Sequence, residues 1–170
     1  WYASRHLPAV LALPLGRGQR LADDPVAVAA LGSGWRPGEP VLVMTAATRS
    51  VVAASAPAGT GTATVEVTER ASEEWFATYA RTREVVREHA EGVLHGSPSQ
   101  AFGLARSADG TVVGVGRLGV SNGWGGLGAM WVEPSARGRG TGRALVHALS
   151  TGAAARGCVS LHLQVESANE

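Results

Sequence analysis

Residues 131–145 of the chain read WVEPSARGRGTGRAL. An apolar run ends at Pro134, then Gly138, Gly140 and Gly142 alternate with arginine and threonine, and an amphipathic segment follows. This pattern predicts a strand, a tight turn and the start of a helix. The first backbone N–H groups of a helix lack intrahelical acceptors and carry partial positive charge, and glycine lets a ligand approach the main chain closely. The stretch therefore has the geometry of a phosphate site.

Two common phosphate motifs do not fit this loop. A Walker-type loop needs a lysine after its last glycine, and the chain contains no lysine. A dinucleotide fingerprint needs Gly-x-Gly-x-x-Gly, but its last position holds arginine when counted from Gly138 and leucine when counted from Gly140. What remains is Val-x-Pro at 132–134 followed by Arg137-x-x-Gly140-x-Gly142. That pattern resembles the acyl-CoA signature of the GNAT superfamily of N-acetyltransferases, and the hexapeptide alone also suits a solvated turn that opens an ordinary helix.

The resemblance implies a cofactor and the residues that hold it. In the family, the loop amides bind the pyrophosphate of coenzyme A, and the preceding strand pairs with the pantetheine arm. Arginine suits bidentate phosphate recognition, so the side chains of Arg137 and Arg139 are expected to add contacts. We expect acetyl-CoA to be bound by Trp131, Val132, Arg137, Gly138, Arg139, Gly140, Thr141, Gly142, Arg143 and Asn169.

The order of predicted elements supports the same family. Alternation at 64–68 predicts a strand, and Ser72 is placed to cap a helical stretch. Asx-Gly turns at 109–110 and 122–123 separate three apolar runs, which predicts an antiparallel meander. The glycine loop, a helix ending at Gly157 and a last strand then form a parallel βαβ unit. The predicted fold class is α/β (α+β), a GNAT-like mixed sheet in which an antiparallel meander precedes a parallel crossover, and it matches the family order over about 105 residues.

The predicted domains are a GNAT acetyltransferase domain at 64–170, a linker at 48–63 and an N-terminal piece at 1–47. Family members continue beyond Asn169 with a helix that often carries a tyrosine and with two closing strands, so we expect the C-terminal part of this domain to be missing. The preferred interpretation makes residues 1–47 the closing part of a preceding GNAT-like domain or a packing segment. The alternative makes this piece supply the closing elements itself. The alternative requires a strand at 41–46 directly beside the strand at 161–165.

Composition limits the classes of function. With 45% hydrophobic and 17% charged residues, the chain is globular. Its 15 arginines nearly balance 14 acidic residues, which argues against a nucleic-acid partner. No apolar run approaches the roughly 20 residues that span a bilayer, so no membrane partner is expected. The single cysteine, Cys158, excludes an intrachain disulfide and favours a reducing, cytoplasmic location.

The residues for catalysis are less clearly marked than the cofactor loop. Acyl transfer to an amine needs a base, donors for the oxyanion and a proton for the thiolate. Family members that use a carboxylate place it on the strand before the loop, but residues 125–130 contain nothing ionisable. His162 and Glu166, on the polar face of the last strand, are the candidate catalytic residues, although a hydrogen-bonded strand face is the commoner reason for such residues there. Trp75 and Tyr79 lie where the family builds its acceptor site, and both also suit a core.

The predicted function is an N-acetyltransferase that moves an acetyl or short acyl group from acetyl-CoA to an amine acceptor, either a small molecule or a protein. The alternative is a catalytically degenerate module that binds acyl-CoA or a partner, because the carboxylate and the tyrosine are absent. No metal site is expected, and a homodimer is possible. By resemblance, a splay between the strand ending at Val132 and the strand at Leu161 admits the cofactor.

Overall fold

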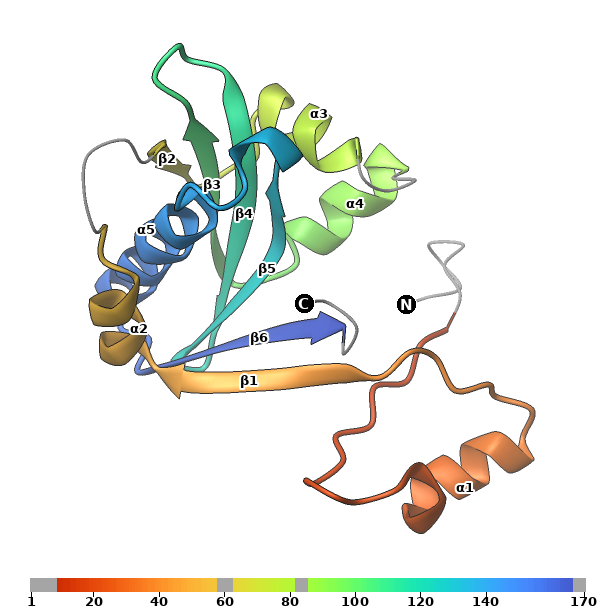
Figure 1. Ribbon diagram of the computed structural model, residues 1–170. Coiled ribbons are helices and arrows are strands. Elements are labelled where there is room, and N and C mark those ends of the chain that lie inside the picture. The colour runs from red at the N-terminus through yellow and green to blue at the C-terminus, as the bar shows by residue number, and fades with distance from the viewer. Residues whose placement is uncertain (1–8, 58–62, 82–85, 167–170) are drawn as a thin grey trace. The chain divides into compact units, whose positions relative to one another are not determined.

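The computed structural model describes residues 9–57, 63–81 and 86–166 (Figure 1). The chain divides into two compact units, one made chiefly of the residues before Val41 and the other of Val41–Val165. Within the described residues, no helix combines the length and the apolar character needed to cross a bilayer.

The first unit contains one α-helix, α1 (Pro25–Gly32), among its described residues. Asp24 caps α1, because its Oδ1 accepts hydrogen bonds from the backbone N–H groups of Val26 and Ala27, each at 2.9 Å. Pro25 occupies the first helical position, where the missing N–H would have no intrahelical acceptor. Local sequence chemistry therefore sets the start of this helix.

The second unit is built on one mixed sheet of six strands: β1 (Val41–Ala47), β2 (Thr64–Thr68), β3 (Ser99–Arg106), β4 (Val112–Ser121), β5 (Trp124–Val132) and β6 (Ser160–Glu166). The spatial order is β1-β6-β5-β4-β3-β2. Strands β2 to β5 pair antiparallel in sequence order, and β5 pairs parallel with β6. The predicted fold class, an antiparallel meander followed by a parallel crossover, is confirmed.

Two tight hairpins produce the meander, as the Asx-Gly pairs predict. Asn122 and Gly123 have φ values of 50° and 76°, the left-handed conformations that a two-residue primed turn requires. In the β3–β4 hairpin, Gly110 has φ 85°. Asp109 closes that turn by accepting hydrogen bonds from Ser107 Oγ at 2.6 Å and from the Thr111 N–H at 3.0 Å.

Helices cover both faces of the sheet (Figure 1). On one face α5 (Thr141–Ala155) buries Leu149 against Leu118 and Leu161, and α2 (Thr48–Ser55) adds Val51 to the same cluster. On the other face α3 (Glu73–Ala80) and α4 (Arg87–Leu94) pack on β3 and β4. That second cluster contains Trp75, Phe76, Leu94, Phe102, Leu104 and Val115.

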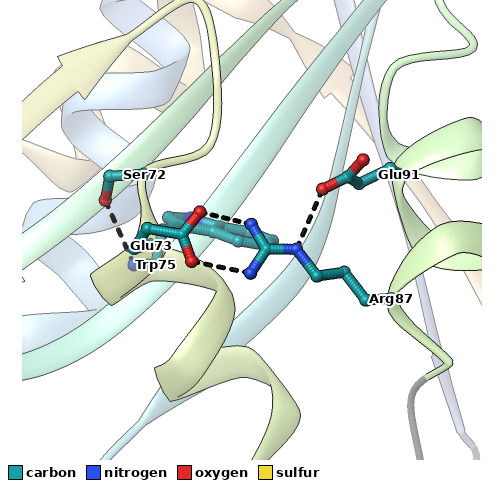
Figure 2. Close-up of polar contacts among 5 residues, drawn as sticks. All are labelled: Ser72, Glu73, Trp75, Arg87 and Glu91. Carbon is teal, nitrogen blue, oxygen red and sulfur yellow. Dashed lines mark hydrogen bonds and ion pairs between the residues drawn. The ribbon is translucent and has the colours of Figure 1, made fainter.

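Polar contacts fix the start of α3, which carries Trp75 (Figure 2). Ser72 Oγ accepts a hydrogen bond from the Trp75 backbone N–H at 3.1 Å, as the sequence predicts for a helix cap. The guanidinium of Arg87 donates to both carboxylate oxygens of Glu73 and, through Nε, to Glu91 at 3.0 Å. The hydrogen bond from Arg87 is the main reason that the pKa of Glu73 lies below its ordinary value. Residues of α4 thus hold the first turn of α3.

The N-terminal part of the second unit differs from the preferred prediction. The expected linker at 48–63 begins with a helix, α2, rather than with irregular chain. This helix is joined to the sheet and to α5: the Thr48 N–H donates to the Val159 carbonyl at 3.0 Å, and His147 Nδ1 lies 3.1 Å from the Val52 carbonyl. Strand β1 lies next to β6, at the edge of the sheet. The alternative, in which the N-terminal piece supplies a closing strand, requires this neighbourhood, and the division of the chain into domains stays a prediction.

Candidate cofactor cleft and acyl-transfer site

The central feature of the site is a fork between β5 and β6 (Figure 1). The two strands pair only from Trp124 opposite Ser160 to Leu127 opposite Leu163. Beyond that point β5 continues to residue 132 and β6 to residue 166, but the two strands no longer pair. Among the described residues, no strand pairs with the edge of residues 128–131 that faces β6, so this edge is open to hydrogen bonding with an extended ligand. The splay expected from the family resemblance is present.

A β-bulge in β5 lies inside the fork. Val115 pairs with Trp131 and Arg117 pairs with Gly128, so Gly116 of β4 faces two residues of β5, Ala129 and Met130. Ala129 has φ 49°, a left-handed conformation that is uncommon for a residue with a Cβ atom. Bulges bend a strand and redirect its main chain. Here the bulge redirects the part of β5 that has parted from β6.

Glycine at position 116 is required by the packing around the bulge. A Cβ atom at this position would lie 2.5 Å from Met130 Sδ and 3.0 Å from Leu149 Cδ1. Gly128, on the other side of the bulge, has no atom within 4 Å of the corresponding point. The two glycines in the same bulge thus have different environments, one close-packed and one open.

The predicted glycine loop connects the fork to α5. A 3-10 turn at Pro134–Ala136 ends the strand, and Gly138 and Gly140 follow with φ values of 70° and 82°. The first helical hydrogen bond runs from the Ala144 N–H to the Gly140 carbonyl at 2.9 Å. In the described part of the chain, no group accepts a hydrogen bond from the N–H groups of residues 138–143. These donors and the helix dipole have the geometry on which the predicted anion site depends, and the site itself stays a prediction.

Side chains of the loop make protein contacts that the sequence did not reveal. Arg137 folds back onto β5, where its Nε donates to the Val132 carbonyl at 3.0 Å and its guanidinium lies 4.7 Å from the Trp131 ring centroid. Arg143 Nε donates to the Ala56 carbonyl, at the end of α2, at 3.1 Å. The loop therefore offers main-chain donors, while these two arginines brace the loop and the helix.

Two further loop residues differ in exposure. Thr141 is buried, and its Oγ1 donates to the Ala136 carbonyl at 3.3 Å, so this hydroxyl closes the turn from within. Arg139 is exposed and makes no side-chain hydrogen bond to the described residues. All three arginines of this stretch are exposed, and Arg139 differs in having no side-chain hydrogen bond to the described residues. Asn169 lies outside the described residues.

Glu133, the residue between Val132 and Pro134, is held by a salt bridge. Its Oε1 lies 2.8 Å from Nη1 of Arg81, the residue that follows α3, and its side chain is only 24% exposed. The contact ties the end of α3 to the residue between β5 and the glycine loop. Glu133 therefore has a bracing role that its place beside Pro134 did not indicate.

The side chains of the two candidate catalytic residues, His162 and Glu166, have no hydrogen-bond partners among the described residues. His162 is half-buried on β6 opposite Gly126, and its ring occupies the space above that glycine, where a Cβ atom would be 2.8 Å from Nε2. Its ring centroid is 6.3 Å from that of Trp124. Glu166 is the exposed last residue of β6. Among the described residues, neither side chain has a hydrogen-bond or ion-pair partner.

Trp75 and Tyr79, the suggested acceptor-site residues, have different surroundings. Trp75 is 1% exposed and belongs to the core, where it stacks on Tyr79 at 5.1 Å and meets Phe102 edge-on at 5.1 Å. Tyr79 is half-buried. The Trp75 indole N–H donates to the carbonyl of Gly116 at 3.1 Å, a bond that connects α3 to the bulge. Sequence reasoning missed this link because glycine alternates along β4 and nothing local distinguishes Gly116.

A sheet that forks between two parallel strands, with a glycine loop and a helix N-terminus after the first of them, is the framework of an acyl-CoA-dependent transferase. The model of the acetyltransferase (GNAT) family matches residues 64–170. Because this match covers more than half of the chain, the protein belongs to the GNAT family.

Solved structures agree with this assignment. A tandem GNAT protein from the clavulanic acid biosynthesis pathway superposes with a TM-score of 0.68 at 17% identity, covering 95% of this chain and 55% of its own. A GCN5-related N-acetyltransferase from Sphaerobacter thermophilus gives 0.56 at 20% identity, covering 85% of this chain and 49% of its own. At these identities the likeness shows the fold alone. The chain spans about half the length of both proteins.

A third structure is more similar in sequence. A proposed acyl-CoA N-acyltransferase from Klebsiella pneumoniae is 27% identical with a TM-score of 0.50, and the match covers 59% of this chain and 70% of that one. No curated protein matches the chain.

Proposed function

We propose that the protein transfers an acetyl or other short acyl group from coenzyme A to an amine carried by a small molecule or a protein. One observation carries the proposal: the edge of β5 at 128–131, which no described strand pairs, leads toward the glycine loop at 138–143, whose N–H groups have no acceptor among the described residues. An extended amide chain suits the first segment and a pyrophosphate suits the second. Acetyl-CoA has these two parts in this order.

The residues of the fork fit the cofactor by chemistry as well as by shape. Gly138 has positive φ and nothing within 4 Å of its Cβ position, so the main chain there is uncovered. Charge-assisted hydrogen bonds contribute about 1.5–3 kcal/mol each, and a few of them suffice to hold a diphosphate. When bound, acetyl-CoA supplies an activated acyl thioester. Backbone N–H groups at the bulge are placed to orient the acyl oxygen.

We assign the proton transfers to two side chains of β6 that are at least partly exposed to solvent. An amine must lose its proton to attack a thioester, so a general base within reach of the fork is required. His162 lies one residue before the last paired position of the fork, and Glu166 ends the strand. We propose His162 as the first candidate, acting directly or through a water molecule, and Glu166 as the second.

The runner-up function is a module that binds acyl-CoA without transferring the acyl group. It is favoured by residues 125–130, which contain no ionisable side chain, and by the lack of a hydrogen-bond partner for His162 and Glu166 among the described residues. A base that is oriented by a second group is the usual arrangement in enzymes of this type of chemistry.

One experiment separates the two functions. The chain is mixed with acetyl-CoA and a panel of primary amines, free thiol is followed with a chromogenic disulfide, and cofactor affinity is measured by calorimetry in parallel. Amine-dependent thiol release above the uncatalysed rate supports the transferase. Tight binding of acetyl-CoA without thiol release for any amine favours the module, and no binding of either CoA or acetyl-CoA refutes both.

A further inference from the structure

The bond between Trp75 and Gly116 joins the helix layer to the bulge. Trp75 Nε1 donates to the Gly116 carbonyl at 3.1 Å, and the Trp75 side chain is 1% exposed. Gly116 is the residue of β4 that faces the two bulged residues of β5. Ala129, one of these two, packs against the same cluster as Trp75. The indole thus contacts the bulge region through a directional bond and through packing.

The bulge holds a strained conformation that needs such support. Ala129 has φ 49°, and a non-glycine residue persists in this region only where its surroundings fix it. The surroundings come from both faces of the sheet: Met130 lies against Gly116 on the α5 face, and the Trp75 cluster packs on Ala129 from the α3 face. Trp75 supplies the directional bond in this arrangement.

We propose that Trp75 is a positioning residue for acyl transfer, whose indole N–H, by bonding to the Gly116 carbonyl, keeps the main chain of residues 128–131 in the shape that meets the acyl group. This inference rests on the proposed function. It assigns no contact with substrate to Trp75, because the side chain is buried. It makes the acyl end of the site depend on Trp75, whereas no residue of the glycine loop at 138–143, which receives the pyrophosphate, belongs to the Trp75 cluster among the described residues.

The placement of α3 explains how this dependence is maintained. Ser72 caps the helix at the Trp75 N–H, and Arg87 of α4 holds Glu73 in the same first turn (Figure 2). At the other end, Arg81 pairs with Glu133 at the exit of β5. Trp75 lies between these two attachments, and its buried ring packs against Phe76, Tyr79 and Phe102 beside Gly116.

The test removes the indole N–H and compares the effect on the bulge at 128–131 with the effect on the glycine loop at 138–143. Trp75→Phe keeps an aromatic ring in the core but cannot donate to Gly116. Backbone amide hydrogen exchange at residues 128–131 is measured on the cofactor-free protein, and affinities for CoA and acetyl-CoA are measured by calorimetry. We expect exchange at 128–131 to be about tenfold faster and the preference for acetyl-CoA over CoA to fall about fivefold, while CoA affinity stays within about twofold, as expected for the loss of one hydrogen bond.

The matched control is Phe76→Leu, which loosens the same cluster from the next residue of α3 and leaves the Trp75 bond in place. If Phe76→Leu changes exchange at 128–131 and the affinity ratio as much as Trp75→Phe does, the effect is general softening of the core and the positioning role is overturned. Unchanged exchange and an unchanged ratio in Trp75→Phe overturn it as well. Should Trp75→Phe not fold, replacing the Trp75 indole by an isosteric benzothiophene removes the N–H and keeps the ring shape.

These readouts separate the inference from the proposed function. A wild-type protein that releases no thiol with any amine refutes the transferase, and the exchange and affinity comparisons still decide the role of Trp75 at the bulge. If thiol release is found, Trp75→Phe is expected to lower kcat about tenfold with the KM for the cofactor changed by less than about threefold.

Discussion

The glycine loop gives the sharpest prediction, because the chain contains a matched control for it. Gly140 is the N-cap of α5 with φ 82° and ψ 0°, and Gly110, in the β3–β4 hairpin, has φ 85°. Valine at either position must adopt a left-handed backbone, at a cost of about 1–2 kcal/mol or more. We therefore expect Gly140→Val and Gly110→Val to lose similar free energies of unfolding, as measured by urea denaturation.

Only the change at Gly140 is expected to affect the cofactor. A branched side chain at the N-cap covers N–H donors of residues 138–143, and losing two charge-assisted bonds of about 1.5 kcal/mol each weakens binding by about 3 kcal/mol, more than a hundredfold. The assay is titration calorimetry with CoA, performed on both variants at a temperature where denaturation curves show them folded. If Gly140→Val binds CoA within about threefold of Gly110→Val, the main-chain anion site is not at this helix N-terminus.

Three further predictions concern the fold around the site. Gly116→Ala places a Cβ 2.5 Å from Met130 Sδ and should cost about 1–3 kcal/mol of unfolding free energy. Gly128→Ala meets no atom within 4 Å and should cost less. Equal losses of unfolding free energy in urea melts would contradict the packing described at the bulge. Ser72→Ala should cost about 1 kcal/mol by removing the cap of α3, and a thermal melt of this variant that matches the wild type would show that the cap contributes nothing. Hydrogen bonds from Ser107 and Thr111 lower the pKa of Asp109 to about 2, so its contribution to stability is present above pH 3.8 and is lost as the pH falls toward 2. Asp109→Asn should therefore reduce the pH dependence of the urea midpoint between pH 4 and 2. An unchanged slope would mean that Asp109 titrates normally.

The sequence predicted those parts of the fold that depend on local chemistry. The Asx-Gly turns, the Ser72 cap and the positive-φ glycines each follow from a residue type with a known backbone preference, and these features fix the meander and the start of α5. Alternation at 160–166 predicted β6 because its two faces meet different surroundings.

Features that depend on contacts far apart in the chain were not predicted. The helix at 48–55 leads into a run of small residues that predicts a linker, and its contact with the core, Val51 in the cluster that contains Leu149 of α5, joins segments far apart in the chain. The bulge in β5 arises from a register shift against β4, and a run of glycine and alanine has no periodicity from which to read such a shift. The partner of Glu133 is Arg81, which lies far away in sequence and reaches it only through the position of α3.

The arginines of the loop show why composition alone misjudges an anion site. Three arginines between residues 137 and 143 suggest recognition by side-chain charge, yet Arg137 is bonded to the Val132 carbonyl and Arg143 to the Ala56 carbonyl. Each of these bonds satisfies a carbonyl at the end of an element and joins the loop or α5 to a neighbour. We therefore propose that the N–H groups at the helix N-terminus, rather than the Nε atoms of these two arginines, recognise the phosphate. A site of this kind fixes the position of the phosphate, because main-chain donors cannot move with a displaced ligand as a flexible side chain can. For the proposed acyl transfer, this rigidity suits a site that holds a thioester at a fixed distance from the bulge, and it joins the glycine loop and the strand bonded through Gly116 to Trp75 into one proposed binding surface.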